Sequence, residues 1–174
     1  GTILLNGSAV LLHQFSVHEI ASYLPQTIYL PKGTVGEILG ERRDERDNHQ
    51  NNLVKELIEM FDLHQLGNGH KLPQDVSNRE IGEKGRGISG GQRQRLAFAK
   101  AVSEGKPVLL IDEGTSSVDS STSRKLIEKI FSKNPAITCI FATHDNAILP
   151  LFDEVIVVKN GSTFSSQGPA AYQR

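Results

Sequence analysis

The stretch PVLLIDEGTSSVDSSTSRKLIEKIFSKNPAITCIFATH, residues 107–144, predicts a strand, a helix and a second strand in that order. Its two ends, 107–112 and 136–144, are continuous apolar runs, which are typical of strands buried on both faces of a parallel sheet. Between them, Asp119 or Ser120 can cap a helix with one apolar face, formed by Leu126, Ile127, Ile130 and Phe131. Parallel strands joined by a helix form a βαβ unit, so we expect an α/β fold.

Both ends of the chain predict hairpins or sheet edges. GTILLNG (1–7) and VIVVKNGSTF (155–164) each place an Asn-Gly pair after a short apolar run. Asn-Gly is a strong turn signal between strands, because both residues accept the positive φ of a tight hairpin turn.

The middle of the chain, residues 36–84, is rich in charged and amide side chains and contains no convincing strand. A helix is predicted from NNLVKELIEMFDL (51–63), in which apolar residues recur at helical spacing: Leu53, Leu57, Met60 and Phe61. The charged run before it, ERRDERDNHQ (41–50), is expected to be a solvated surface. We therefore expect one domain, with an α/β core formed by residues 1–34 and 96–174 and a helical subdomain formed by residues 35–95.

Composition excludes several classes of protein. Nineteen Lys and Arg against 20 Asp and Glu leave a formal charge of -1, so no overall basic field favours nucleic acid or an anionic membrane. The single cysteine, Cys139, excludes an intrachain disulfide, fits a reducing compartment and is expected to pack in the core. No run approaches the ~18 apolar residues of a membrane-spanning helix.

ISGGQRQRLAFAK (88–100) predicts a helix start that can bind a phosphate. A helix N-terminus presents unpaired N–H groups, and glycines let an anion approach the backbone closely. The helix then has Leu96, Ala99 and Val102 available to face inward. A flexible glycine linker followed by an ordinary helix cap is the alternative.

Asp112 and Glu113 follow the apolar strand VLLI, and ligands of open α/β sheets bind beyond the carboxyl ends of the strands. Adjacent residues on an extended strand point in opposite directions, so the two carboxylates can have separate roles. Asp112 could hold Mg²⁺ while Glu113 deprotonates an attacking water. Capping or surface acids at a strand exit are the alternative.

The order of several short motifs resembles the nucleotide-binding domain of an ABC transporter. The motifs correspond to the Q-loop, signature, Walker B, D-loop and switch histidine of that family: YLPQ (23–26), ISGGQRQR (88–95), VLLIDE (108–113), SSVD (116–119) and ATHD (142–145). Five motifs in order are far less frequent by chance than one. The resemblance implies a RecA-like P-loop NTPase core with a mainly parallel sheet, an inserted helical subdomain, and ATP with Mg²⁺ bound between head-to-tail partners.

The resemblance also implies site residues. The γ-phosphate held by the opposite subunit would be contacted by Ser89, Gly90, Gly91 and Gln92. Gln26 would sense Mg²⁺ and the lytic water, and His144 would hydrogen-bond the γ-phosphate and help position Glu113. Asp119 would lie at the dimer seam. Without the other motifs, Gln26 is a loop residue, His144 a capping or core histidine, and Asp119 a helix cap.

Two stretches resemble exporters within this family: YLPQTIYLPKGTVGEIL (23–39) and REIGEKGRGISGGQ (79–92). By that resemblance, Glu80 and Glu83 would touch the intracellular loops of a transmembrane domain. The expected partners are a second nucleotide-binding domain and that transmembrane domain, at the cytoplasmic face of the membrane, with no nucleic acid. Soluble ABC ATPases of DNA repair or translation, and non-catalytic regulatory domains of this fold, are the alternatives.

The sequence departs from the family in two places. It contains no GxxxxGK[ST] phosphate loop, since its Gly105-Lys106 pair is followed by Pro107. We expect the N-terminal part of the fold to be missing, with a fragment favoured over a truncated product or a half-domain, and weak or no hydrolysis by the isolated chain. Gly114 stands where relatives often carry Pro or Ala and is expected to loosen the turn after Glu113.

Overall fold

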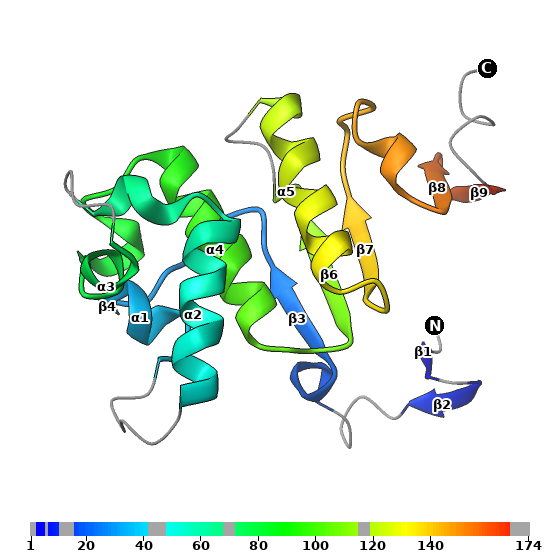
Figure 1. Ribbon diagram of the computed structural model, residues 1–174. Coiled ribbons are helices and arrows are strands. Elements are labelled where there is room, and N and C mark those ends of the chain that lie inside the picture. Colours follow the sequence, from blue (N-terminus) through cyan, green and yellow to red (C-terminus); the bar gives the residue numbers. More distant parts are fainter. Residues whose placement is uncertain are drawn as a thin grey trace.

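The computed structural model describes residues 3–5, 7–10, 16–41, 48–67, 72–114 and 119–167. Its centre is a three-stranded parallel sheet in the order β3-β6-β7 (Figure 1). The strands are β3 (Ala21–Leu24), β6 (Val108–Asp112) and β7 (Thr138–Ala142). Helix α4 (Gly90–Ser103) precedes β6, and helix α5 (Ser120–Lys133) joins β6 to β7. The predicted βαβ unit and the parallel sheet are therefore confirmed.

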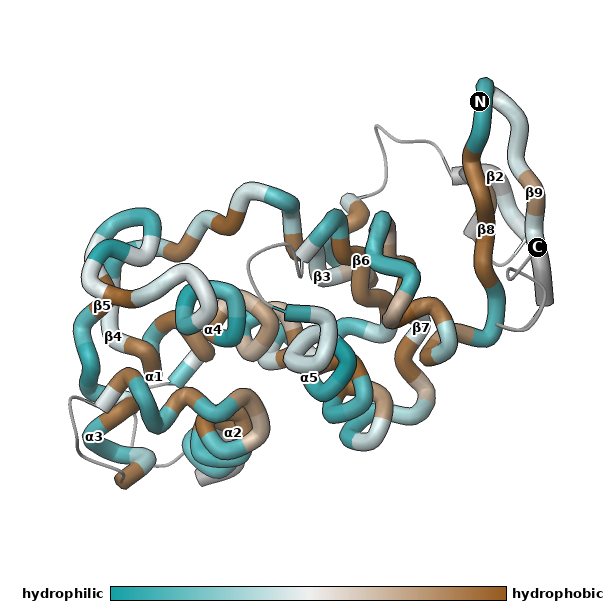
Figure 2. The backbone as a smooth tube through the Cα atoms, turned by 90° about the horizontal axis from the view of Figure 1, so that it is seen from above, coloured by the Kyte–Doolittle hydropathy of each residue, from teal (hydrophilic) through white to brown (hydrophobic). Residues whose placement is uncertain are grey.

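The two faces of this sheet differ in burial. Leu109 and Ile111 are buried, whereas Tyr23 and Ile140, which both pair with Leu110, are exposed. Right-handed crossovers between strands in sequential order place their helices on the same face, and α5 lies along one side of the strands in Figure 2. The prediction that both apolar runs are buried on both faces is therefore wrong for β7.

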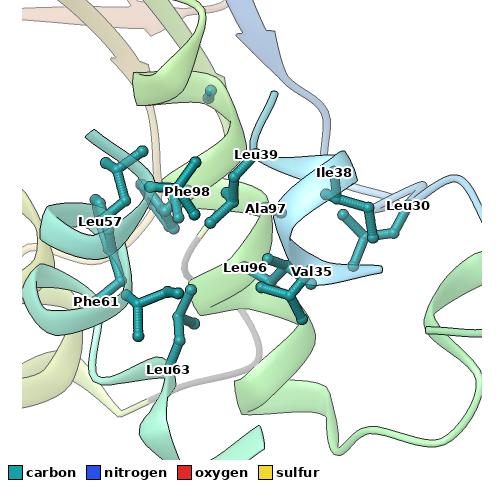
Figure 3. Packing of buried hydrophobic residues seen from close by; sticks show 14 of the residues in the cluster. Leu30, Val35, Ile38, Leu39, Leu57, Phe61, Leu63, Leu96, Ala97 and Phe98 are labelled. Carbon is teal, nitrogen blue, oxygen red and sulfur yellow. The ribbon is translucent and has the colours of Figure 1, made fainter. Parts of the chain in front are cut away.

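A helical unit packs against α4, and its helix α2 (Asn48–Met60) also faces α5. The unit also contains α1 (Val35–Ile38), the 3₁₀ turn η2 (Leu63–Leu66) and α3 (Pro73–Ser77). The apolar face predicted for α2 is confirmed, because Leu57 and Phe61 are buried and Leu53 and Met60 are partly buried. Leu57 and Phe61 belong to the same packed cluster as Leu96 and Phe98 of α4 (Figure 3). Of the predicted charged run, residues 42–47 lie outside the described residues.

A short antiparallel pair lies within this helical unit. Strand β4 (Gly33–Thr34) pairs with β5 (Glu80–Ile81), so the prediction of no strand in residues 36–84 is wrong by these two residues. A strand of two residues is too short to show periodicity in the sequence. Its partner β4 also lies far away in the chain, so no local pattern marks the pair. Helix α1 begins with a capping box between Thr34 and Glu37, and the 3₁₀ turn η3 (Glu83–Gly85) follows β5. The division into core and subdomain stays a prediction, since α4 runs across its boundary at residue 95.

Two hairpins complete the described fold. One joins β1 (Ile3–Leu5) to β2 (Ser8–Val10), and the other joins β8 (Glu154–Lys159) to β9 (Ser162–Gln167). Asn160 and Gly161 have φ values of 51° and 75°, as a tight hairpin turn requires. Both predicted hairpins are confirmed. Short 3₁₀ turns, η1 (Val17–Glu19) and η4 (Leu149–Leu151), precede β3 and β8.

Cys139 lies in β7 and packs against the core, as predicted. Burial raises the pKa of its thiol to about 11, so it behaves as an apolar core residue. Within the described part of the chain, none of the helices combines the length and the apolar character that crossing a membrane requires.

Candidate functional site

Three polar side chains meet beyond the carboxyl ends of the three parallel strands. Gln26 follows β3, Glu113 follows β6 and His144 follows β7. Gln26 Nε2 donates to Glu113 Oε2 at 2.7 Å, and His144 Nδ1 lies 3.3 Å from Glu113 Oε1. These contacts join residues 87 and 31 positions apart, because adjacent parallel strands end at the same edge of the sheet. We call Gln26, Glu113 and His144 the Glu113 cluster; the structure brings them together, while their roles stay predictions.

The backbone of Glu113 has left the strand. Its φ is 48°, in the left-handed region that costs energy for a residue with a side chain, and its N–H donates to the carbonyl of Ala142 at 2.9 Å. The expected reason for the separation of Asp112 and Glu113 is therefore wrong: a left-handed turn after β6, not strand alternation, sets the direction of Glu113. Such strain persists only where surrounding contacts hold it, here from Ala142, Gln26 and His144.

Gly114 is closely surrounded by side chains at this turn. A Cβ at Gly114 would lie 2.6 Å from Ile111 Cγ2 and 2.8 Å from Leu24 Cδ2, closer than real Cβ contacts. Gly114 is also buried, so side chains of β3 and β6 approach it closely. The predicted loosening of the turn stays a prediction.

The loop that carries His144 is held by its neighbours. The Asp145 N–H donates to Thr143 Oγ1, and the Ala147 N–H donates to Asp145 Oδ1, each at 2.9 Å. The side chain of His144 is 78% exposed, whereas that of Glu113 is 32% exposed. An ionised carboxylate can only accept, so a hydrogen bond to an ionised Glu113 requires the proton of His144 to be on Nδ1. Sequence reasoning missed Thr143 and Asp145 as supports, although both stand inside ATHD.

Asp112 is the last residue of β6, and its side chain is exposed. Among the described residues, no group of three or more His, Cys, Asp or Glu side chains is arranged to hold a metal ion. Asp112 and the amide oxygen of Gln26 are nevertheless ligands of the kind that Mg²⁺ prefers, and Mg²⁺ commonly binds through one or two protein oxygens together with water and phosphate. These donors fit a Mg²⁺ ion that arrives with a nucleotide.

The second predicted site lies at the start of α4, and we call residues 89–92 the Ser89 segment. Ser89 Oγ accepts from the Gln92 N–H at 3.2 Å, and the Ser89 N–H donates to Gln92 Oε1 at 2.9 Å, which forms a capping box. Ser89 and Gly90 are exposed, and Gly91 is partly buried. A Cβ at Gly90 would meet nothing within 4 Å, and φ of Gly90 is not positive. Packing among the described residues therefore does not require glycine there, whereas close approach of an outside group would.

Asp119 caps α5, as its alternative interpretation predicted. Its carboxylate accepts from the Ser121 hydroxyl, from Thr122 Oγ1 at 2.7 Å and from the Thr122 N–H at 3.0 Å. The hydrogen bonds from Ser121 and then Thr122 hold the pKa of Asp119 well below its usual range. Its place at a dimer seam stays a prediction, and residues 116–118 of the same motif lie outside the described residues.

Glu80 lies in β5 and Glu83 in η3, a few residues before the Ser89 segment, and both side chains are exposed. Exposure makes both available to another chain, and their contact with a transmembrane domain stays a prediction. Sequence reasoning missed one residue on this side: the Gln65 carbonyl of η2 accepts from Gln92 Nε2 at 3.3 Å. No sequence signal marks a backbone carbonyl.

The parallel sheet, with its helices and with polar residues at its carboxyl edge, defines an open-sheet α/β protein, a class in which ligands bind at that edge. The family described as "ABC transporter" matches residues 1–116. The chain therefore belongs to the ABC transporter family.

Individual relatives are ABC transporters or export proteins by name. The chain is 31% identical over 164 residues to a putative export ATP-binding/permease protein of Rickettsia conorii, covering 92% of the chain and 27% of that protein. It is 30% identical over 162 residues to ABC transporter B family member 6 of Dictyostelium discoideum, covering 92% of the chain and 23% of that protein. The chain thus spans about a quarter of the length of these relatives.

A solved structure supports the fold. The structure of a bacterial Atm1-family ABC exporter with ATP bound superposes with a TM-score of 0.77 at 24% identity, covering 98% of this chain and 29% of that chain. At this identity the likeness shows the α/β fold alone.

Proposed function

We propose that this chain forms the ATP-binding and ATP-hydrolysing part of an ABC exporter, in which hydrolysis of Mg²⁺-ATP is coupled to transport. The observation that carries the proposal is the Glu113 cluster, in a chain of this family. Its position at the carboxyl edge of the parallel sheet is where a nucleotide would bind.

Glu113 acts as the general base. Each carboxylate oxygen has about two lone-pair sites, so contacts with Gln26 and His144 leave room for a water to donate to the same group. Glu113 takes the proton of that water as it attacks the γ-phosphate, and the two neighbours fix the direction of the carboxylate. His144 would hydrogen-bond the γ-phosphate, for which its side chain is accessible at 78% exposure.

Asp112 and Gln26 would hold Mg²⁺, Asp112 directly or through water. The ion would neutralise charge on the phosphate oxygens. The Gln26 amide can serve both purposes, because its Nε2 donates to Glu113 and its oxygen remains an acceptor.

The Ser89 segment would contact the γ-phosphate presented by a second nucleotide-binding domain in a head-to-tail dimer. Two observations support this: the positive end of the α4 dipole is exposed, and Gly90 has open space around it. Asp119 would then face the same seam, and Glu80 and Glu83 would face a transmembrane domain at the cytoplasmic side of the membrane. Residues 35–95 would form the helical subdomain of this assembly.

Substitution of Glu113 by Gln tests the proposal. In the natural protein that contains this sequence, we expect Glu113→Gln to lower ATP turnover by about 10²–10⁴-fold, the usual contribution of a general base, and to leave ATP binding intact. Lys159→Gln, at an exposed site on β8, is the matched control. Retained turnover in the Glu113 variant would refute the general-base role, and ATP binding without turnover in the unsubstituted protein would indicate a regulatory domain.

A further inference from the structure

A groove of about 780 Å³ runs between α2 and α5. Its apolar lining comes from Leu53, Leu57 and Met60 of α2 and Val102 of α4. Its charged lining is acidic on α2, at Glu56 and Glu59, and mainly basic on α5, at Lys125, Lys129 and Lys133. The groove is open to solvent, so α2 and α5 face each other here mainly through charged side chains along its edges.

Two ion pairs join α5 to the helical unit: Lys133 and Glu56 both line the groove, whereas Asp62 lies outside its lining. Lys129 Nζ lies 3.2 Å from Asp62 Oδ2, and Lys133 Nζ pairs with Glu56. The two lysines lie one helical turn apart on α5, and all four side chains are partly exposed. Exposed pairs of this kind are weak and are screened by salt, so they can bias the orientation of two units without being needed for folding.

Asp62 connects this groove to the Ser89 segment. It occupies the cap position of η2 with a left-handed backbone, and η2 contains the carbonyl of Gln65. That carbonyl accepts from Gln92 Nε2, and Gln92 forms the capping box with Ser89. A continuous series of contacts therefore runs from α5, through Asp62 and η2, to the exposed start of α4.

Packing supports this connection. Leu63 of η2 is buried in the same cluster as Phe61 and Leu96, so η2 rests on α4 through apolar contacts as well as through Gln92 (Figure 3). A shift of η2 would then be transmitted to the first turn of α4.

We propose that Lys129 is a positioning residue for the Ser89 segment. Acting through Asp62, η2 and Gln92, it fixes Ser89 relative to the sheet that carries Glu113, and the Lys133–Glu56 pair supports the same orientation. The importance of this positioning for ATP turnover rests on the proposed function, whereas the contact series itself does not.

Amide hydrogen exchange at the start of α4 tests the proposal in the folded chain. We expect Lys129→Ala to speed exchange of the Gln92 and Arg93 amides, which are bonded to Ser89, by about 1.5- to 5-fold, the range expected from an exposed ion pair. Lys129→Arg keeps the charge and should restore the slow exchange. The difference should shrink at about 1 M salt, where the screening length is about 3 Å.

Lys125→Ala is the matched control. Lys125 lies one turn earlier on α5, lines the same groove and forms no ion pair with a described residue. Equal exchange in the Lys125 and Lys129 variants would overturn the proposal. So would failure of the exchanged pair, Asp62→Lys with Lys129→Asp, to recover part of the protection lost in Lys129→Ala.

Turnover measurements separate this proposal from the proposed function. If the natural protein hydrolyses ATP and Lys129→Ala matches Lys125→Ala in both exchange and turnover, the positioning role fails and the function stands. If no ATP is hydrolysed but exchange depends on Lys129, the function fails and the contact series stands.

Discussion

The Glu113 cluster and the Ser89 segment differ in how far contacts within the chain occupy their polar groups and surroundings. In the cluster, the carboxylate contacts an amide and an imidazole, and the Glu113 N–H is bonded to Ala142. In the segment, the capping box satisfies Ser89 and Gln92, but Gly90 faces open space. The sheet edge assembles the first site inside the chain, whereas the second has the form of a surface that another molecule approaches.

The strongest way to break this comparison is to disturb the turn beside the cluster. We expect Gly114→Ala to lower the free energy of unfolding by about 1–3 kcal/mol, because the added methyl group overpacks Leu24 and Ile111. Urea denaturation measures this loss. An unchanged midpoint would mean that these side chains move aside without cost, and that the cluster is less tightly assembled than its contacts indicate.

The sequence predicts the sheet edge well because apolar runs determine strands, and the carboxyl ends of parallel strands must meet. Glu113 and His144 could therefore be expected at one edge before the structure. Gln26 was expected there only through the family resemblance, because no strand was predicted at Ala21–Leu24. The left-handed conformation of Glu113 could not, because it depends on the Ala142 carbonyl of another strand. Propensity describes single segments and does not report contacts between them.

The same limit explains the other differences. Strand β5 exists because Glu80 and Ile81 pair with β4, and Ile140 is exposed because of the face on which the helices cross. The link from Gln65 to Gln92 uses a backbone carbonyl, which every residue carries. The helix start at the Ser89 segment could be predicted, because the residues that form its cap, Ser89 and Gln92, are close together in the sequence.

Ser89 sharpens the comparison by separating a structural cap from a phosphate contact. We expect Ser89→Ala to lower the free energy of unfolding by about 1 kcal/mol, the usual cost of a lost N-cap, measured by urea denaturation. Ser89→Asp keeps an acceptor for the Gln92 N–H and should retain stability. Its negative charge should nevertheless reduce ATP turnover in the natural protein, and unchanged turnover would count against a phosphate at this position.

Gly90 should respond in the opposite way to Gly114. Nothing lies within 4 Å of a Cβ at Gly90, so we expect Gly90→Ala to leave the free energy of unfolding unchanged or to raise it by up to about 1 kcal/mol. ATP turnover in the natural protein should fall, because the methyl group occupies the space proposed for the partner's phosphate. Normal turnover would show that no group approaches Gly90 closely.

The smallest effect is expected at the second helix cap, Asp119, where the test combines a change of pH with a substitution. Hydrogen bonds from Ser121 and Thr122 hold the pKa of Asp119 below its ordinary value of 3.8, so the ionised cap adds stability above that value and loses it as pH falls toward the lower folded pKa. Between about pH 5 and about pH 3, the chain should therefore lose more stability than its Asp119→Asn variant, which keeps an acceptor without the charge. The effect is small because Asp119 is exposed and salt screens it.

Ser89 has no titrating group, so this acid-dependent difference between chain and variant should appear in the amide exchange of α5 and be absent from that of α4. Its appearance in α4 would show that the two helix starts are coupled.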